Sequence, residues 1–174
     1  MAGVHDYQTR YWKQLVQLKH DIEYLRLYNE DSVQKEKKLN AVLAILSAGS
    51  LALWVVIGKV AILWAAIIVA TQLVNAIKPH LPYQQRMKHT AELSTEIQGL
   101  FLYSERRWFE VAEGMLEDEQ IHHITMEIRQ RRDELERNHF RGNPLPEKER
   151  HRLKAEESTE TYFKTLYGGE VING

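Results

Sequence analysis

The chain has 174 residues, of which 27% are charged, and its formal net charge at pH 7 is −1. This near balance provides no overall positive field of the kind that attracts nucleic acid, so we expect no nucleic-acid partner. Cysteine is absent, which excludes disulfide bonds and thiolate chemistry.

Residues 1–40 are predicted to form an N-terminal helix. The stretch 4–39 holds neither glycine nor proline, and its apolar residues recur at steps of three and four. Such a stripe is typical of a helix that packs against another helix. We expect a break only at residues 29–32, where residues that favour helix caps gather. The stripe consists of Tyr11, Leu15, Leu18, Ile22, Leu25 and Tyr28.

Residues 41–78 contain two long uncharged stretches, 41–57 and 60–77, separated by Gly58 and Lys59. As a single helix, the segment would be ~55 Å long, would exceed the ~30 Å hydrocarbon core of a bilayer and would place Lys59 near its middle. Two helices that fold back at Gly58 and Lys59 fit a bilayer better, and we predict a two-helix transmembrane hairpin. The alternative is an apolar hairpin inside a soluble bundle, which would require broad apolar faces on the surrounding helices.

Basic residues lie on both sides of the predicted hairpin, whereas its turn holds Lys59 alone. The positive-inside rule therefore places both termini in the cytoplasm and the turn outside. We expect a multi-pass membrane protein with cytosolic flanking helices. The basic residues are Arg26, Lys35, Lys37 and Lys38 before the first span, and Lys78, Arg86 and Lys88 after the second.

Small residues recur at four-residue spacing within the spans, which favours close packing of helices in lipid. They are Ala44, Ala48, Ala52, Ala61 and Ala65. Polar side chains fall in the cytoplasmic half of the predicted hairpin, where exposure to lipid would be costly. They either form hydrogen bonds between helices or line a water-filled path, and a pore would require several copies because two spans cannot enclose one. These residues are Asn40, Ser47, Thr71, Gln72 and Asn75.

Residues 83–140 are predicted to form a long cytosolic helical segment, because Pro79 and Pro82 end the second span. Its apolar residues keep a heptad phase at first and resume out of phase after the acidic patch 117–119. Gly114 and this phase shift indicate a kink or a break into two helices. The two runs are Leu93, Ile97, Leu100, Trp108, Val111 and Met115, then Ile121, Ile124, Ile128 and Leu135.

Residues 141–174 are predicted to form a linker, a short helix and a tail, with an apolar patch at Tyr162, Phe163, Leu166 and Tyr167 that can dock on the bundle. The predicted fold class is all-α, a transmembrane hairpin flanked by long cytosolic helices that pack as a coiled-coil-like bundle. The bundle seam is also expected to join copies of the chain. It consists of Leu15, Leu18, Ile22, Leu25, Leu93, Ile97, Leu100 and Val111.

The sequence shows no catalytic constellation. His122 and His123, near Glu119 and Met126, form the only cluster that resembles a metal site. Adjacent helical residues point about 100° apart, so these histidines cannot share an ion without a partner helix. No glycine-rich phosphate loop or catalytic triad appears either. We expect no enzymatic activity, cofactor or metal, and we expect His89 to lie among lipid headgroups.

The layout resembles the SLATT domain family of bacterial conflict systems. The resemblance rests on a helix ending KEKKLN, two tight spans, a proline-bearing exit and a long helix beginning RMKHTAELSTEI, and it covers residues 8–140. It implies a defence effector of the bacterial inner membrane that oligomerises and forms a pore or disrupts the bilayer. The implied partners are lipid, further copies of the chain, and a separate sensor protein or a signalling nucleotide. The alternative function is a membrane-anchored coiled-coil scaffold without pore activity.

Overall fold

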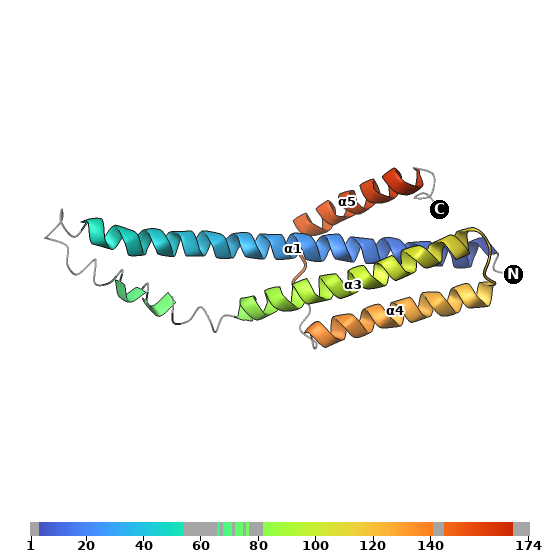
Figure 1. Ribbon diagram of the computed structural model, residues 1–174, viewed down its shortest axis with the longest axis horizontal. Helices are drawn as coiled ribbons and strands as arrows, with labels where there is room; N and C mark the ends of the chain where they lie inside the picture. The colour runs from blue at the N-terminus through green and yellow to red at the C-terminus, as the bar shows by residue number, and fades with distance from the viewer. Residues whose placement is uncertain are drawn as a thin grey trace. The chain divides into compact units, whose positions relative to one another are not determined.

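A computed structural model of the protein is helical, and no strand occurs among the residues that it describes (Figure 1). The all-α prediction is therefore confirmed. The named helices are α1 (Val4–Leu53), α3 (Pro82–Ala112), α4 (Asp118–Phe140) and α5 (Glu149–Tyr167). The structure describes residues 4–53, 66, 68–70, 72–74, 76, 82–140 and 145–168.

The chain divides into two compact units. One unit comprises Met1–Asn29 together with His89–Gly174, and we call it the bundle unit. The other comprises Glu30–Lys88, and we call it the 30–88 unit. Helix α1 begins in the bundle unit and ends in the 30–88 unit, so the boundary lies within a continuous helix.

Helices α1 and α3 run antiparallel in the bundle unit. The Gln8 side-chain amide donates to the carbonyl of Val111 at 3.0 Å, and the Tyr11 hydroxyl donates to the carbonyl of Ser104 at 2.9 Å. Residue numbers thus fall along α3 as they rise along α1. Buried tyrosine hydroxyls need a partner, and this hydrogen bond provides one across the two helices.

Helix α4 runs parallel to α1, and α5 runs antiparallel to it, so the four helices alternate in direction along the chain (Figure 1). The short connections from α3 to α4 and from α4 to α5 favour reversal of direction between these helices. The contacts that show the directions are Tyr7 with His122 and Asp21 with Arg132 for α4, and Trp12 with Phe163 and Tyr24 with Pro146 for α5.

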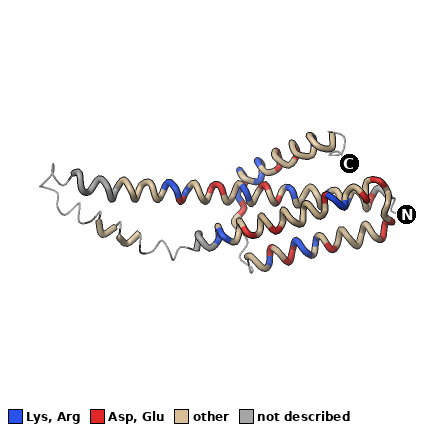
Figure 2. Tube along the Cα trace, viewed as in Figure 1, with Lys and Arg blue, Asp and Glu red and all other residues tan. Residues whose placement is uncertain are grey.

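The core of the bundle unit is built from the apolar stripes that the sequence predicts. Each stripe follows the helical repeat, so one face of each helix is buried and the other carries charge. Figure 2 shows the charged residues spread along the four helices. The buried apolar residues include Tyr11, Leu15, Leu18, Ile22 and Leu25 of α1, Leu93, Ile97, Phe101 and Val111 of α3, Ile121, Ile124, Ile128 and Leu135 of α4, and Phe163 of α5.

The break predicted near Gly114 is confirmed. Gly114 adopts a positive φ of 67°, its N–H donates to the carbonyl of Val111, and the N–H of Met115 donates to the carbonyl of Glu110. These bonds form a Schellman motif, which ends a helix where glycine tolerates the left-handed conformation. The Gln120 side chain then accepts a hydrogen bond from the N–H of Glu117 at 2.9 Å and caps the start of α4.

The break expected at residues 29–32 is wrong, because α1 continues through them to Leu53. No proline or glycine interrupts this stretch. An ion pair between Asp31 and Lys35, at 3.1 Å and one helical turn apart, also supports the helix.

The predicted transmembrane hairpin lies largely outside the described residues. Residues 54–65, where the turn at Gly58 and Lys59 is predicted, are not described, and neither are several residues of the predicted second span. Among the helices that the structure describes, none is both long enough and apolar enough to cross a bilayer. The described parts of the two predicted spans expose large aliphatic side chains, which are Val42, Ile45, Ile68, Val69, Leu73 and Val74.

Candidate functional sites

The predicted seam lies inside a single chain. Seven of its eight residues belong to the buried core, and Leu100 is partly buried against that core. The prediction that these stripes pack helix against helix is therefore confirmed within the bundle unit. Contact between copies through the same residues stays a prediction, and in this arrangement the core of one chain already buries them.

An ion pair joins α1 to α4 beside the core. Arg132 Nε lies 2.6 Å from Asp21 Oδ2, and a second nitrogen of Arg132 lies 3.1 Å from Glu136. The side chains of Asp21 and Arg132 are only 14% and 23% exposed. Burial acts to lower the pKa of Arg132, but the negative charges of Asp21 and Glu136 outweigh it and raise this pKa. The guanidinium therefore stays charged and holds the two helices in register.

A cavity of about 400 Å³ opens next to this ion pair between α1, α3 and α4. Apolar side chains form much of its wall, and its lining holds three carboxylates and one arginine, while the adjacent Arg132 pairs with two of these carboxylates and leaves a small acidic excess. This charge balance disfavours the phosphates of a nucleotide and favours a neutral or cationic ligand. The lining residues are Asp21, Tyr24, Leu25, Leu93, Ile97, Asp133, Glu136, Arg137, Phe140 and Leu145.

A second cavity, of about 560 Å³, lies between α1 and α5. Lys13 and Arg152 in its lining are balanced by Glu156 and Glu160. The hydroxyl of Thr159, a residue only 4% exposed, has no hydrogen-bond partner in this lining. This cavity thus offers two buried polar atoms without a hydrogen-bond partner, the Thr159 hydroxyl and His20 Nδ1, between balanced acidic and basic side chains.

The predicted docking patch of α5 is confirmed for three of its residues. Phe163 is buried in the core with its ring against Trp12, whereas Leu166 is 59% exposed. Glu105 of α3 accepts hydrogen bonds from the hydroxyls of Tyr162 at 2.7 Å and Tyr167 at 3.1 Å. Burial, with the nearby charge of Glu105, raises the pKa of Tyr167 to about 12. Both tyrosines stay protonated and able to donate.

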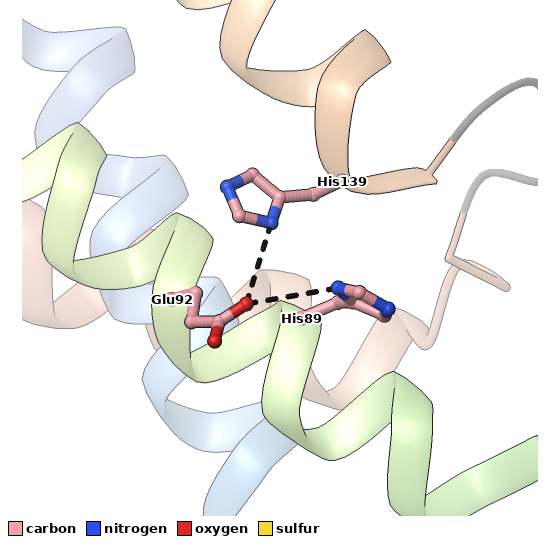
Figure 3. A group of neighbouring side chains, drawn as sticks. All are labelled: His89, Glu92 and His139. Carbon is pink, nitrogen blue, oxygen red and sulfur yellow. Dashed lines mark ion pairs between the residues drawn. The ribbon is translucent and has the colours of Figure 1, made fainter.

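A group of histidines and glutamates joins α3 to the end of α4 (Figure 3). One carboxylate oxygen of Glu92 lies 3.7 Å from His89 Nδ1 and 3.9 Å from His139 Nδ1. On the other side of the same imidazole, His139 Nε2 lies 3.3 Å from a carboxylate oxygen of Glu96. Sequence reasoning missed this group, and His89, expected among headgroups, lies beside Glu92. The i, i+3 spacing of His89 and Glu92 was the only local signal.

The histidine pair singled out in the sequence does not form a site with other ligands among the described residues. The ring of His122 packs edge-on against Tyr7 at 5.9 Å, and both His122 and His123 are exposed. Their neighbouring positions point them in different directions, as expected for consecutive residues of a helix.

The residues proposed to act within the membrane are only partly described. Asn40 and Ala44 are exposed on α1, and Gln72 is helical and exposed. Their roles, and those of the rest of the polar face and the packing alanines, stay predictions. Ser47, Ala48 and Ala52 lie in α1 with undescribed side chains, and Ala61, Ala65, Thr71 and Asn75 lie outside the described residues.

The resemblance to the SLATT domain family rests on the layout of the sequence, and it stays an expectation. We also compared the chain with protein-family models, with curated proteins and with solved structures. None of these three comparisons finds a match.

Proposed function

We propose that the protein is a membrane effector of a bacterial defence system. In this proposal, residues 41–77 insert into the inner membrane as a two-helix hairpin, the bundle unit stays in the cytoplasm, and several copies assemble to make the membrane leak. The observation that carries the proposal is the exposure of Ile45, Val69 and Leu73, which are 70%, 66% and 59% exposed.

Aliphatic side chains on this scale are costly to leave in water. Fully burying one Val, Leu or Ile side chain is worth about 1.5–3 kcal/mol, and six such residues are exposed in the described parts of the segment. The bundle unit uses its own apolar stripes for its own core, as the near-zero exposure of Leu18, Ile97 and Ile128 indicates. The soluble-bundle alternative requires broad apolar faces beyond those stripes, and lipid supplies an apolar environment without them.

Assembly through the spans fits these observations better than assembly through the predicted seam. The seam residues are buried or partly buried within one chain, whereas Asn40, directly before the apolar segment, and Gln72 within it occupy exposed helical positions. Amide groups in a membrane favour contact with other helices or with water. We therefore propose that copies meet through the hairpin and that its polar residues face the resulting interface or a pore.

The trigger is proposed to be a separate sensor protein that acts on the bundle unit. The cavity beside Asp21 and Arg132 carries more acidic than basic groups, which makes a signalling nucleotide a poor fit there. A protein partner requires no such cavity, because it can bind the outer faces of the helices.

The test is expression of the full chain in bacteria with a dye that reports membrane potential. We expect the chain to fractionate with membranes and to dissipate the potential, and the Gln72→Leu, Asn75→Leu variant to stay in membranes but lose the dissipation. The matched control is Gln98→Leu, Asn138→Leu, since both of these residues are exposed on helices of the bundle unit. Purification of a soluble monomer without detergent would contradict the proposal.

The second candidate is a membrane-anchored scaffold. It is favoured by Leu102 and Phe109 of α3, which are 56% and 61% exposed and lie seven residues apart on one helix face. Such a face suits a partner helix. Under this candidate, the Gln72 and Asn75 substitutions have little effect, whereas Phe109→Ala abolishes capture of the partner.

A further inference from the structure

The group formed by His89, Glu92 and His139 has the composition of a metal site. Two imidazoles and a carboxylate converge from two helices, and their ligand atoms all lie within 4.8 Å of one another (Figure 3). Nitrogen and oxygen ligands of this kind suit zinc and neighbouring divalent transition metals. We infer that His89, Glu92 and His139 bind a divalent transition-metal ion, with Zn²⁺ as the first choice, and leave a fourth position for water.

The distances are close to those that a tetrahedral zinc ion requires. With metal–ligand bonds of ~2.0–2.1 Å, the ligand atoms lie ~3.3 Å from one another. The Glu92 oxygen is 3.7 Å from His89 Nδ1 and 3.9 Å from His139 Nδ1, about half an ångström longer than this spacing, and the ligand atoms of the two imidazoles lie within 4.8 Å of each other, so side-chain rotation of His89 must bring them closer. His89 and Glu92 are 46% and 44% exposed, which leaves them room for the small side-chain rotations involved.

The third ligand is oriented in advance by a carboxylate. His139 is only 12% exposed, and its Nε2 faces Glu96 at 3.3 Å. A proton shared with Glu96 at Nε2 leaves the Nδ1 lone pair directed toward Glu92 and His89. Metal-binding histidines are commonly held in this way by a carboxylate on the opposite ring nitrogen. Glu96 is therefore a positioning residue of the site.

The electrostatic setting also favours a cation. Glu92 and Glu96 bring two carboxylates to the group, and His139 lies in the last turn of α4, which ends at Phe140. The carbonyl groups at the end of a helix carry partial negative charge. A bound ion would link α3 to the end of α4, far from the Schellman turn that joins the other ends of these helices, and would stabilise the bundle unit by binding only its folded form.

The experiment is equilibrium dialysis of the full-length protein against Zn²⁺ after treatment with a chelator. We expect one Zn²⁺ per chain and visible absorption of a tetrahedral site when Co²⁺ replaces Zn²⁺. His89→Ala and Glu92→Gln should each weaken binding at least tenfold, and Glu96→Gln should weaken it about tenfold, as is typical for loss of a carboxylate behind a histidine ligand. Circular dichroism of each variant shows whether the helices are retained.

The matched control is His123→Ala, because His123 is exposed on the same helix and belongs to no ligand group among the described residues. We expect it to bind Zn²⁺ as the unaltered chain does. Equal binding by the His89→Ala variant, or the absence of stoichiometric Zn²⁺ in the unaltered chain, would overturn the inference. Neither result bears on membrane insertion, so this test is independent of the proposed function.

Discussion

Aliphatic side chains fill a buried core in the bundle unit, whereas those in the described parts of the apolar segment of the 30–88 unit are largely exposed. In the bundle unit, Leu18, Ile97 and Ile128 are at most 1% exposed, whereas Val69 and Leu73 in the 30–88 unit are 66% and 59% exposed. Charge is scarce only in the middle of the 30–88 unit, since residues 41–77 hold Lys59 alone among Lys, Arg, Asp and Glu, whereas the rest of that unit is rich in charge. Figure 2 shows basic and acidic residues at intervals along the helices of the bundle unit.

This contrast indicates that the width of a helix's apolar face determines whether neighbouring helices can bury it. A stripe on one side of a helix is covered by three or four neighbours of the same kind, and the charged side stays in water. A helix that is apolar all round cannot be covered by such narrow faces. It requires either a large core or lipid.

The largest expected effect comes from placing charge on the apolar segment. In the double variant Val69→Lys, Leu73→Lys, each lysine should raise the free energy of membrane insertion by about 2.5–3.5 kcal/mol. We expect the double variant to move from the membrane fraction to the soluble or aggregated fraction. Leu102→Lys with Phe109→Lys should leave the distribution unchanged, although these residues are equally exposed. If both double variants leave the membrane fraction to the same extent, the apolar segment has no special role in membrane insertion.

The next effect concerns the core of the bundle unit. Leu18 is fully buried, so Leu18→Ala should lower the free energy of unfolding by about 2–5 kcal/mol. Leu102→Ala, at a position 56% exposed, should change it by less than about 0.5 kcal/mol. Chemical denaturation followed by helical circular dichroism measures both variants. Similar values for the two would contradict the core described for this unit.

A smaller effect is expected from the ion pair between α1 and α4. Arg132→Met leaves Asp21 without its closest cation and should lower the free energy of unfolding by about 1–3 kcal/mol. Arg131→Met removes an exposed pair with Glu134 and should cost no more than about 1 kcal/mol. The same denaturation measurement compares the two variants. A larger loss of unfolding free energy in Arg131→Met than in Arg132→Met would contradict the larger stabilisation expected from the pair between α1 and α4.

The smallest effect is a dependence on pH. The side chain of Asp21, 3.8 Å away, raises the pKa of His20, and this outweighs the opposing effect of burial. The folded state therefore binds this proton more tightly than the unfolded state. The resulting stabilisation is complete below the ordinary histidine pKa of about 6.5 and is lost as pH rises through the folded-state pKa.

A variant isolates the contribution of His20. We expect His20→Gln to lower the free energy of unfolding by about 0.2–1 kcal/mol at low pH, which is the range for partly exposed ion pairs, and to have less effect at high pH. Unfolding measured on both sides of about pH 6.5 checks this difference. A loss that grows as pH rises would have the wrong sign.

Much of the bundle unit could be predicted because its signals are local. The stripe that contains Leu15 and Leu18 repeats with the helix, and a repeat of that kind fixes which face is apolar before any tertiary contact forms. Gly114 and the change of phase around it marked the turn between α3 and α4. The break expected at 29–32 was wrong. Residues such as Asn, Asp and Ser favour helix caps, but they do not end a helix by themselves when the surrounding sequence continues it.

The candidate sites could not be predicted in the same way. His139 is far from His89 in the sequence, and Asp21 is far from Arg132, so neither contact has a signature at helical spacing. The seam was expected to join copies of the chain because two unpaired stripes do not reveal whether their partners lie in the same molecule. That choice depends on the turns and on α5, whose Phe163 completes the core.

The residue pattern alone was enough to predict a helical chain, the apolar faces of its helices, and the limits of its uncharged segment. The folded structure was needed to show which stripes meet, that they meet within one chain, and that His139 lies beside His89 and Glu92. Periodicity and capping act within a few residues, whereas pairing of helices depends on the direction in which each connection returns the chain.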